Sequence, residues 1–458
     1  MTSARLAAYR VLAEVALGTD LPVAHTRHRD VLPDDRDRAL VTELTTGTLR
    51  WLAALDHIIA SVSARPLAQL DVEVLHVLRL GAYQLVHLDR IPASAAVDQA
   101  VTLVRQIGKA SASSFVNAVL RQIIRLGGDH RLPAIPTVTA SRSEVVSYLS
   151  ITCSHPEWLA ERWFRRLGRD AAIARVRFNN QIPALTLQVN RLRITPAVLA
   201  QQLNTHGVET VPTRFASHGL TVVSGNPLRT PLAQRGLFEV QDEASQLVAE
   251  LAVVRRGERV LDGCAAPGGK TIALATGVGS TGTVVAADLR PARMRLLRAT
   301  LQRFGSQNVQ ILRHDLRHPP FLDAFDCVLV DAPCSGLGTI RRDPDIRWRR
   351  TSVDLARYAD TQRALLAQAA HTVRPGGRLV YATCSSEPEE NEAVVEAFLA
   401  DHPTYEPIHP ERVGVISSGL RSVLNPDGYL STSPEAHALE SFFGVTLLRQ
   451  TGGARLAP

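Results

Sequence analysis

Lysine is almost absent from this chain of 458 residues. Of its 51 lysine and arginine residues, only Lys109 and Lys270 are lysines, although the formal net charge is +7. The simplest interpretation is a genome biased toward arginine codons, so that a remaining lysine is informative. Guanidinium groups suit phosphate contacts, but a basic excess of this size only favours a polyanionic partner and does not establish one.

Other absences exclude whole classes of protein. No run of about 18 uncharged apolar residues occurs, so the sequence predicts no transmembrane helix. Glu14 interrupts the short apolar stretch after Arg10, which argues against a signal peptide. The five cysteines include no CxxC pair, so no metal site is predicted. Their odd number favours free thiols and a cytoplasmic protein, and free thiols can be nucleophiles.

The length of the chain predicts two or three domains, because one compact core rarely grows past about 250–300 residues. Helical spacing of apolar residues makes residues 1–130 an expected all-α bundle. Glycine, proline and small polar residues mark 127–143 as a linker. Residues 144–235 combine a basic helix at 162–177 with short alternating strands, which predicts a small α+β module. The alternative for that module is a structural spacer.

Residues 236–458 have a different pattern, that of an α/β domain. Helical segments separate short apolar runs at 259–262, 283–288, 309–312, 327–331 and 378–382. This alternation predicts a Rossmann-like domain with a parallel sheet covered by helices on both faces. Ligands of such sheets bind beyond the carboxyl ends of the strands. The polar residues that end these runs are therefore the candidate site.

The first apolar run ends at Asp262 and continues into a loop of small residues before Lys270. Small residues let a ligand approach the backbone, and a helix N-terminus follows. A P-loop is the first alternative to weigh, but its pattern requires glycine where Cys264 stands, and Pro267 is also awkward. A nucleoside triphosphatase is therefore disfavoured.

Acidic residues end the next two runs. Asp288, about 20 residues past the loop, suits two ribose hydroxyl groups, and Asp315 is placed to accept from an adenine amino group. Each aspartate alone is equally explained as a helix cap or turn residue. Together they outline an adenosyl site, and the missing G-x-G-x-x-G pattern argues against a dinucleotide.

A cysteine follows each of the last two runs. Cys334 comes shortly after Asp331, and Cys384 directly follows the fifth run and its threonine. Neighbouring strand ends can bring both thiols into one cleft. Cys153 and Cys327, by contrast, are interpreted as small buried hydrophobic residues.

Two thiols beside a methyl donor suit one reaction, methylation of cytosine at C5. C5 is a poor nucleophile until a thiolate adds to C6. A base must later remove the C5 proton so that the thiolate can leave, and an acid near N3 stabilises the adduct. Cys384, Cys334 and Asp331 offer these groups.

These residues resemble the Sun (Fmu) family of RNA cytosine-5 methyltransferases. The matching stretches are Leu261–Thr271, Asp331–Gly336, Tyr381–Ser385, Glu389–Glu392 and Phe238–Gln246. The resemblance implies that Cys384 is the nucleophile and that Cys334 helps to release the product. It also implies an S-adenosylmethionine pocket lined by Cys264, Ala265, Ala266, Pro267, Gly268, Gly269, Lys270, Asp288, Asp315 and Asp331.

The N-terminal region is similar to the RNA-binding domain of the NusB family, best at Ser114–Arg121. The module at 144–235 is similar to the Sun family's small RNA-binding domain. This combination is typical of bacterial enzymes that methylate C5 of a cytidine in 16S ribosomal RNA, and we expect a monomer. Transfer RNA as the substrate is one alternative. A NusB-like RNA-binding factor without catalytic activity is another.

Two basic segments with aromatic residues are the expected RNA contacts. Residues 341–350 place five arginines around Trp348, which suits phosphate neutralisation and base stacking. The alternative is a solvated loop. The helix at 162–177 is the second candidate. One stretch departs from the family, since Glu440-Ser-Phe-Phe443 stands where Asp-Gly-Phe-Phe is common, and this puts the pairing of the last strand in doubt.

Overall fold

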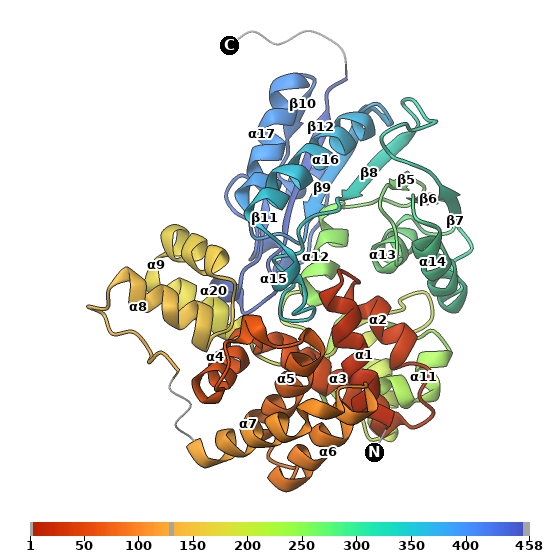
Figure 1. Cartoon of the computed structure of the whole chain (residues 1–458). Coiled ribbons are helices and arrows are strands. Elements are labelled where there is room, and N and C mark those ends of the chain that lie inside the picture. The colour runs from red at the N-terminus through yellow and green to blue at the C-terminus, as the bar shows by residue number, and fades with distance from the viewer. Residues whose placement is uncertain (1–2, 128–131, 452–458) are drawn as a thin grey trace. The chain divides into compact units, whose positions relative to one another are not determined.

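The computed structural model describes residues 3–127 and 132–451, so residues 128–131 of the expected linker lie outside the described residues. The chain forms two compact units (Figure 1). The helical unit comprises Met1–Ile182 and Ile340–Ser352. The second unit comprises Pro183–Thr339 and Val353–Pro458 and is called the catalytic unit after the candidate active site described below. The segment 340–352 is thus an excursion from the second unit into the first.

The first part of the helical unit is a bundle of helices, as predicted. Its elements are α1 (Ser3–Ala16), α2 (Leu21–His28), α3 (Asp35–Arg50), α4 (Leu52–Val62), η1 (Leu67–Gln69), α5 (Val72–His87), α6 (Ala93–Gln106), η2 (Ala110–Ala112) and α7 (Ser113–Leu126). Leucine, valine and isoleucine side chains from these helices form one continuous core. Helices α3 and α5 approach closely at Gly47, where a Cβ atom would overlap the ring of Tyr83.

The helical unit continues with α8 (Arg142–Ser147), the π-helical turn η3 (Tyr148–Thr152) and α9 (Glu157–Asn179). A capping box at Ser141 and Glu144 begins α8. Helix α9 is interrupted at Gly168, whose φ of 78° is not helical. Of the expected module at 144–235, these helices fall in the helical unit and the strands that follow fall in the catalytic unit.

A small antiparallel sheet begins the catalytic unit. Its strands, in the spatial order β2-β3-β1-β4, are β1 (Thr186–Val189), β2 (Glu209–Pro212), β3 (Gly219–Ser224) and β4 (Phe238–Val240). Leu199 and Leu203 of α10 (Pro196–Thr205) pack with its apolar residues. The short elements η4 (Pro227–Arg229) and α11 (Pro231–Gln234) precede β4.

The large sheet of the catalytic unit has the order β10-β12-β9-β8-β5-β6-β7. Its strands are β5 (Arg259–Asp262), β6 (Thr283–Asp288), β7 (Val309–Arg313), β8 (Phe325–Asp331), β9 (Val373–Thr383), β10 (Tyr405–Pro407), β11 (Leu430–Ser431) and β12 (Phe443–Arg449). Strands β5 to β9 are parallel, as predicted, whereas β12 pairs antiparallel with β9, β10 and β11.

Helices cover both faces of this sheet, and β8 shows why. Val328 and Val330 face a core shared with α16 (Ser352–Ala370) and α17 (Glu392–Asp401). Cys327 and Leu329 face the opposite core, which includes α12 (Glu243–Leu251) and α13 (Gly269–Val278). This alternation with period two leaves the polar side chains to the strand ends. The remaining helical elements of this unit are α14 (Pro291–Phe304), η5 (Pro388–Glu390), α18 (Pro410–Val413), α19 (Ser418–Arg421) and α20 (Pro434–His437).

The departure at Glu440 does not disturb the last strand. Phe443 pairs with Thr383, and the register continues to Leu448 opposite Arg378. Glu440 and Ser441 precede the strand and are buried. The backbone of Ser441 donates a hydrogen bond to the carbonyl oxygen of Gly338 (3.0 Å).

Candidate active site

The carboxyl ends of two neighbouring strands bring the two candidate thiols together. Asp331 at the end of β8 pairs in register with Ala382 of β9, and Cys334 and Cys384 lie just beyond these positions. Their sulfur atoms are 3.2 Å apart, and both thiols are free. The sequence predicted that these two thiols would lie close together. Their catalytic roles remain predictions.

The two thiols differ in their electrostatic environment. The hydrogen bond with Cys384 is the largest cause that raises the pKa of Cys334 well above its usual value. Burial and the negative charge of Glu390 act in the same direction. Because two thiolates at this distance would repel each other, the pair carries one negative charge before two. All three causes favour the protonated form of Cys334.

A buried carboxylate, Glu390, connects the two cysteine loops. The backbone N–H of Ser335 donates to its Oε1 atom (2.7 Å), and the hydroxyl groups of Ser335 and Ser385 both donate to its Oε2 atom (2.5 Å each). Gln362 of α16 donates to Oε1 (3.2 Å). Each serine directly follows a cysteine, so one side chain orders both thiols.

Close packing on the other side also limits movement of these loops. The N–H of Gly338 donates to the carbonyl oxygen of Cys384 (3.0 Å). A Cβ atom on Gly338 would lie only 2.7 Å from that same oxygen. Asn391 accepts from the hydroxyl of Thr383 (2.5 Å) and donates to the carbonyl oxygen of Ser385 (3.1 Å). The Cys384 backbone is thereby held on both sides.

Lys270 supplies a positive charge beside this pair. Its Nζ atom donates to Asp331 (2.8 Å) and to Ser245 (2.9 Å). Burial favours the neutral amine, but attraction to Asp331 outweighs it, and the pKa of Lys270 is raised. The charge of Cys384 contributes to that rise, so Lys270 carries its positive charge directly beside the thiol pair.

A cavity of about 120 Å³ lies next to Lys270 and Asp331. Six of the seven expected loop residues line it, namely Cys264, Ala265, Ala266, Pro267, Gly269 and Lys270. The seventh, Gly268, begins α13 with a φ of 115°, a conformation that glycine adopts without strain. Burial raises the pKa of the Cys264 thiol, so this third cysteine is a neutral lining group.

The same cavity contains residues that the sequence did not identify as site residues. Asp262, Gln241, Ser245 and Thr300 also line it. Gln241 and Ser245 fall in the family-like stretch Phe238–Gln246, which was the available signal. Within the described part of the chain, Asp262 Oδ1 and Gln241 Oε1 are buried acceptors without a hydrogen-bond donor. Such atoms favour a ligand that carries positive charge or N–H groups.

The carboxyl group of Asp262 in this cavity has a strongly shifted pKa. Burial raises the pKa of Asp262 to about 7, and repulsion from Asp331 adds to the rise. The hydroxyl of Thr271, which donates to Oδ2 (2.7 Å), opposes it. A cation placed at Oδ1 would favour the charged carboxylate.

Asp288 and Asp315 follow the next two strands but do not line this cavity. Asp288 is buried and accepts from the N–H groups of Ala266 (3.3 Å) and Arg290 (3.1 Å). Asp315 forms a forked ion pair with Arg317, and that hydrogen bond holds the pKa of its carboxyl group below the usual value. Both carboxylates thus have partners, and their ligand roles remain predictions.

The basic segment 341–350 is less exposed than the sequence suggested. Arg347 is completely buried and donates to the carbonyl oxygens of Ser154 (2.9 Å) and Asn179 (3.2 Å). Trp348 donates from Nε1 to the carbonyl oxygen of Leu49 (2.7 Å). The segment is neither a solvated loop nor a row of free arginines, because it packs within the helical unit.

Helix α9 is also less exposed than the sequence suggested. Trp163 is completely buried, and the guanidinium group of Arg175 stacks 5.4 Å from its ring centre while being 5% exposed. Arg165, by contrast, is largely exposed. Only part of this helix is accessible to a nucleic acid.

The remaining sequence predictions concern absences and ordinary thiols. Cys153 and Cys327 are buried, as predicted, and burial raises the pKa of each to about 11. Over residues 3–127 and 132–451, no helix is long and apolar enough to cross a membrane. The same residues contain no group of three or more His, Cys, Asp or Glu able to hold a metal ion.

Three family models match the chain. Residues 250–448 match the family described as 16S rRNA methyltransferase RsmB/F, and residues 2–125 match the NusB family. Residues 155–229 match the ferredoxin-like domain of the RsmF/B-like methyltransferases.

Individual proteins are similar over nearly the full length. The probable ribosomal RNA small subunit methyltransferase B of Bacillus subtilis (strain 168) is 36% identical, covering 91% of this chain and 92% of its own. The protein described in the same words from Synechocystis is 33% identical, covering 98% and 99%. A crystal structure titled PH0851 has a TM-score of 0.78 at 25% identity and covers 98% and 99%.

Proposed function

Because this chain belongs to the RsmB/F family of S-adenosylmethionine-dependent RNA cytosine-5 methyltransferases, we propose that it methylates C5 of a cytidine in 16S ribosomal RNA through a covalent Cys384–C6 adduct. The observation that carries this proposal is the 3.2 Å separation of Cys334 and Cys384 beside Lys270 and Asp331. In that space one nucleobase can contact a nucleophile, a second thiol and an acid.

The residues of the strand-end cavity fit S-adenosylmethionine. Its ammonium and sulfonium groups are positive, and Asp262 Oδ1 and Gln241 Oε1 are buried acceptors that lack a donor in the described residues. The loop Cys264–Lys270 provides a surface of small residues. A volume of about 120 Å³ holds part of the cofactor. We assign its adenosine part to Asp288 and Asp315 at the ends of β6 and β7.

Cys384 is assigned as the nucleophile. Its thiolate forms a bond to C6, and the electron pair of the C5–C6 double bond makes C5 nucleophilic. Asp331, which accepts a hydrogen bond from Lys270, is assigned to hydrogen-bond the nucleobase near N3. S-adenosylmethionine, when bound, supplies the methyl group that C5 accepts.

Cys334 is assigned as the base that completes the reaction. As a thiolate it accepts the proton of C5, the bond between C6 and Cys384 breaks, and the C5–C6 double bond forms again. Once Cys384 is bound to carbon it no longer repels a second thiolate. The hydrogen bond with the Cys384 thiolate, the largest cause of the raised pKa of Cys334, is then lost as well. The same pair of cysteines therefore first activates the cytosine and then releases it.

Glu390 is assigned as a positioning residue for both steps. It holds Ser335 and Ser385, and thereby the cysteines that precede them. Its negative charge also disfavours an early thiolate at Cys334.

Bisulfite sequencing tests the reaction and its substrate together. In a strain that lacks the protein, one 16S cytidine is expected to lose its resistance to deamination, and purified protein should restore it on transcribed RNA. Loss at a transfer RNA position would instead move the substrate to transfer RNA. If no cytidine changes and titration calorimetry detects no S-adenosylmethionine binding, the non-catalytic RNA-binding alternative is correct.

A further inference from the structure

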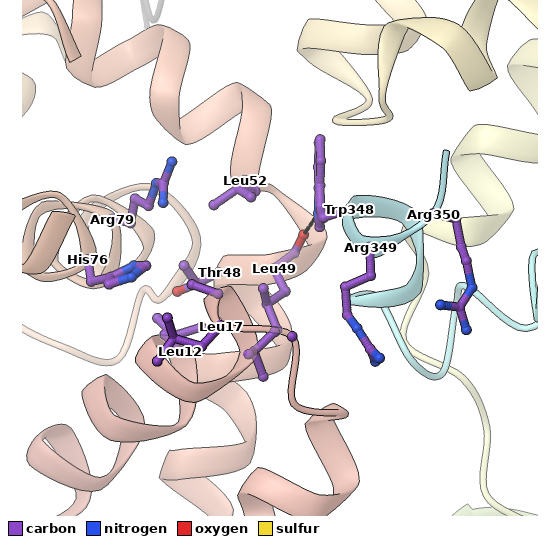
Figure 2. Close-up of a pocket in the computed structure, with 13 residues that line it drawn as sticks. Leu12, Leu17, Thr48, Leu49, Leu52, His76, Arg79, Trp348, Arg349 and Arg350 are labelled. Atoms are coloured by element: carbon purple, nitrogen blue, oxygen red, sulfur yellow. Dashed lines mark hydrogen bonds between the residues drawn. The ribbon is translucent and has the colours of Figure 1, made fainter. Parts of the chain in front are cut away.

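The helical unit contains a cavity of about 510 Å³, formed by α1, α3, α4, α5 and the segment 340–352. Figure 2 shows His76 and Arg79 on one side of it and Trp348 and Arg349 on the other, with apolar side chains such as Leu12 between them. This volume falls within the range of small-molecule sites, roughly 300–1,000 Å³.

One wall of the cavity is a fixed aromatic ring. The hydrogen bond from Trp348 to Leu49 (2.7 Å) holds the indole in place (Figure 2). Neighbouring Asp345 accepts from the N–H of Leu21 (3.3 Å) and binds Arg349 (3.0 Å). Since the ring is already ordered, a ligand that stacks on it loses little entropy in ordering it.

Two polar groups inside the cavity are suited to a neutral ring with donors and acceptors. Thr48 is completely buried, and its hydroxyl has no hydrogen-bond partner in the described residues. Leaving a buried hydroxyl without a partner is unfavourable, and a ligand group that hydrogen-bonds to it would recover that cost. Burial lowers the pKa of His76 to about 4, so near pH 7 its neutral ring offers one donor and one acceptor.

The charged residues that line the cavity are all basic. Arg79, Arg349 and Arg350 line it, and no acidic residue of the described chain does. Arg79 is held by a forked pair with Asp56 (2.7 Å for both bonds), and Arg349 by Asp345 and Asp20. Their guanidinium planes are therefore fixed. Such planes suit both stacking and phosphate contacts.

We propose that this cavity binds one unstacked nucleotide of the RNA substrate, with the base against Trp348 and its phosphate toward the arginines. Bases stack on aromatic and guanidinium planes, and cationic side chains neutralise phosphates. A fatty acyl chain would leave Thr48 and His76 without partners. The proposal rests on RNA being the substrate, and it is independent of which cytidine is methylated.

A bulky residue placed in the cavity tests the proposal without deleting core atoms. Ala16 is exposed and lines the cavity, so Ala16→Trp should fill it. Ala93, at the exposed start of α6 and away from the cavity, provides the matched control Ala93→Trp. Thr48→Val removes only the unpartnered hydroxyl. The probe is full-length transcribed 16S RNA containing 4-thiouridine, used for filter binding and for photo-crosslinking with the full chain.

We expect Ala16→Trp to weaken RNA binding about tenfold and Thr48→Val about threefold, with Ala93→Trp and S-adenosylmethionine affinity unchanged. Wild-type crosslinks should map to the peptides that contain Trp348 or Leu49. The proposal is overturned if Ala16→Trp binds RNA as tightly as Ala93→Trp, or if crosslinks avoid these peptides. It is also overturned if AMP or UMP binds the cavity while RNA does not. Failure of the proposed function would instead appear as normal RNA binding by the wild type without methylation.

Discussion

Glu390 in the catalytic unit and Arg347 in the helical unit are both completely buried charged residues. The groups that hydrogen-bond to each are neutral. Glu390 gathers the residues that follow Cys334 and Cys384, whereas Arg347 gathers backbone carbonyl groups from separate segments of its unit. The same physical feature therefore orders chemistry in one unit and architecture in the other. Variants in the two units should consequently fail in different ways.

The largest expected effect is in the catalytic unit. Cys384→Ala should reduce methyl transfer to 16S RNA by on the order of a thousandfold or more, because no thiolate is left to add to C6. S-adenosylmethionine affinity, measured by calorimetry, should change little. Turnover near that of the wild type would show that Cys384 is not the nucleophile.

The second prediction separates the two thiols. Cys334→Ala should accumulate a covalent protein–RNA complex on a denaturing gel, since the adduct forms but the C5 proton has no base. Turnover should fall by about a hundredfold. Cys153→Ala, which removes a buried thiol of the helical unit, should give no complex. A complex that forms with Cys384→Ala instead would reverse the two roles.

The third prediction moves the comparison to the helical unit. Arg347→Met should lower the free energy of unfolding of that unit by about 3 kcal/mol, because several buried carbonyl oxygens lose their donor. Arg357→Met, at an exposed arginine of α16, should cost less than about 0.5 kcal/mol. Denaturant unfolding measures both values. Equal stabilities would mean that Arg347 does not anchor the segment 340–352.

The fourth prediction concerns pH and Asp262. Its pKa is raised from 3.8 to about 7 in the folded chain, so the folded state holds this proton more tightly than the unfolded state. Stability from this group is present at low pH and is lost as the pH rises through about 7. Between pH 5 and pH 8 the wild type should lose about 2 kcal/mol more than Asp262→Asn. Parallel pH profiles of unfolding would contradict the shifted pKa.

The smallest effect is expected at Glu390. Glu390→Gln preserves the shape of the side chain but removes its charge, so we expect about a tenfold loss in kcat with little change in KM. In the pH profile of adduct release, the acidic limb that reports deprotonation of Cys334 should also move to lower pH. The reason is that the negative charge of Glu390 raises the pKa of that thiol. Glu392→Gln, at the exposed start of α17, is the control. If the two variants behave alike, Glu390 has only a structural role.

The sequence predicted the strand ends well, and the reason is geometric. Five short apolar runs separated by helical segments predict parallel strands, and parallel strands place their carboxyl ends along one edge. Asp331, Cys334 and Cys384 follow directly from that arrangement. The sequence did not identify Gln241 and Asp262 as site residues. A buried acceptor without a hydrogen-bond donor arises only where the folded chain excludes water.

The sequence did not predict which side chains of the arginine-rich stretches are buried, for a related reason. Arginine replaces lysine nearly everywhere in this chain, so a cluster of arginines carries little information about exposure. Trp163 and Arg175 pack together in the interior, and Arg347 is buried among carbonyl groups. Composition gave the charge of these segments but not their neighbours. The borders of the expected domains, 1–130, 144–235 and 236–458, likewise remain predictions.

The amino-acid sequence by itself determined the helical bundle, the central parallel strands and the identity of the groups at their ends, because these depend on local periodicity and on residue chemistry. Tertiary structure alone decided which charges are buried, that the segment 340–352 packs in the helical unit, and that one carboxylate orders both thiols. Those features depend on contacts between residues far apart in the chain. Local patterns do not encode which distant carbonyl group or thiol a side chain will meet.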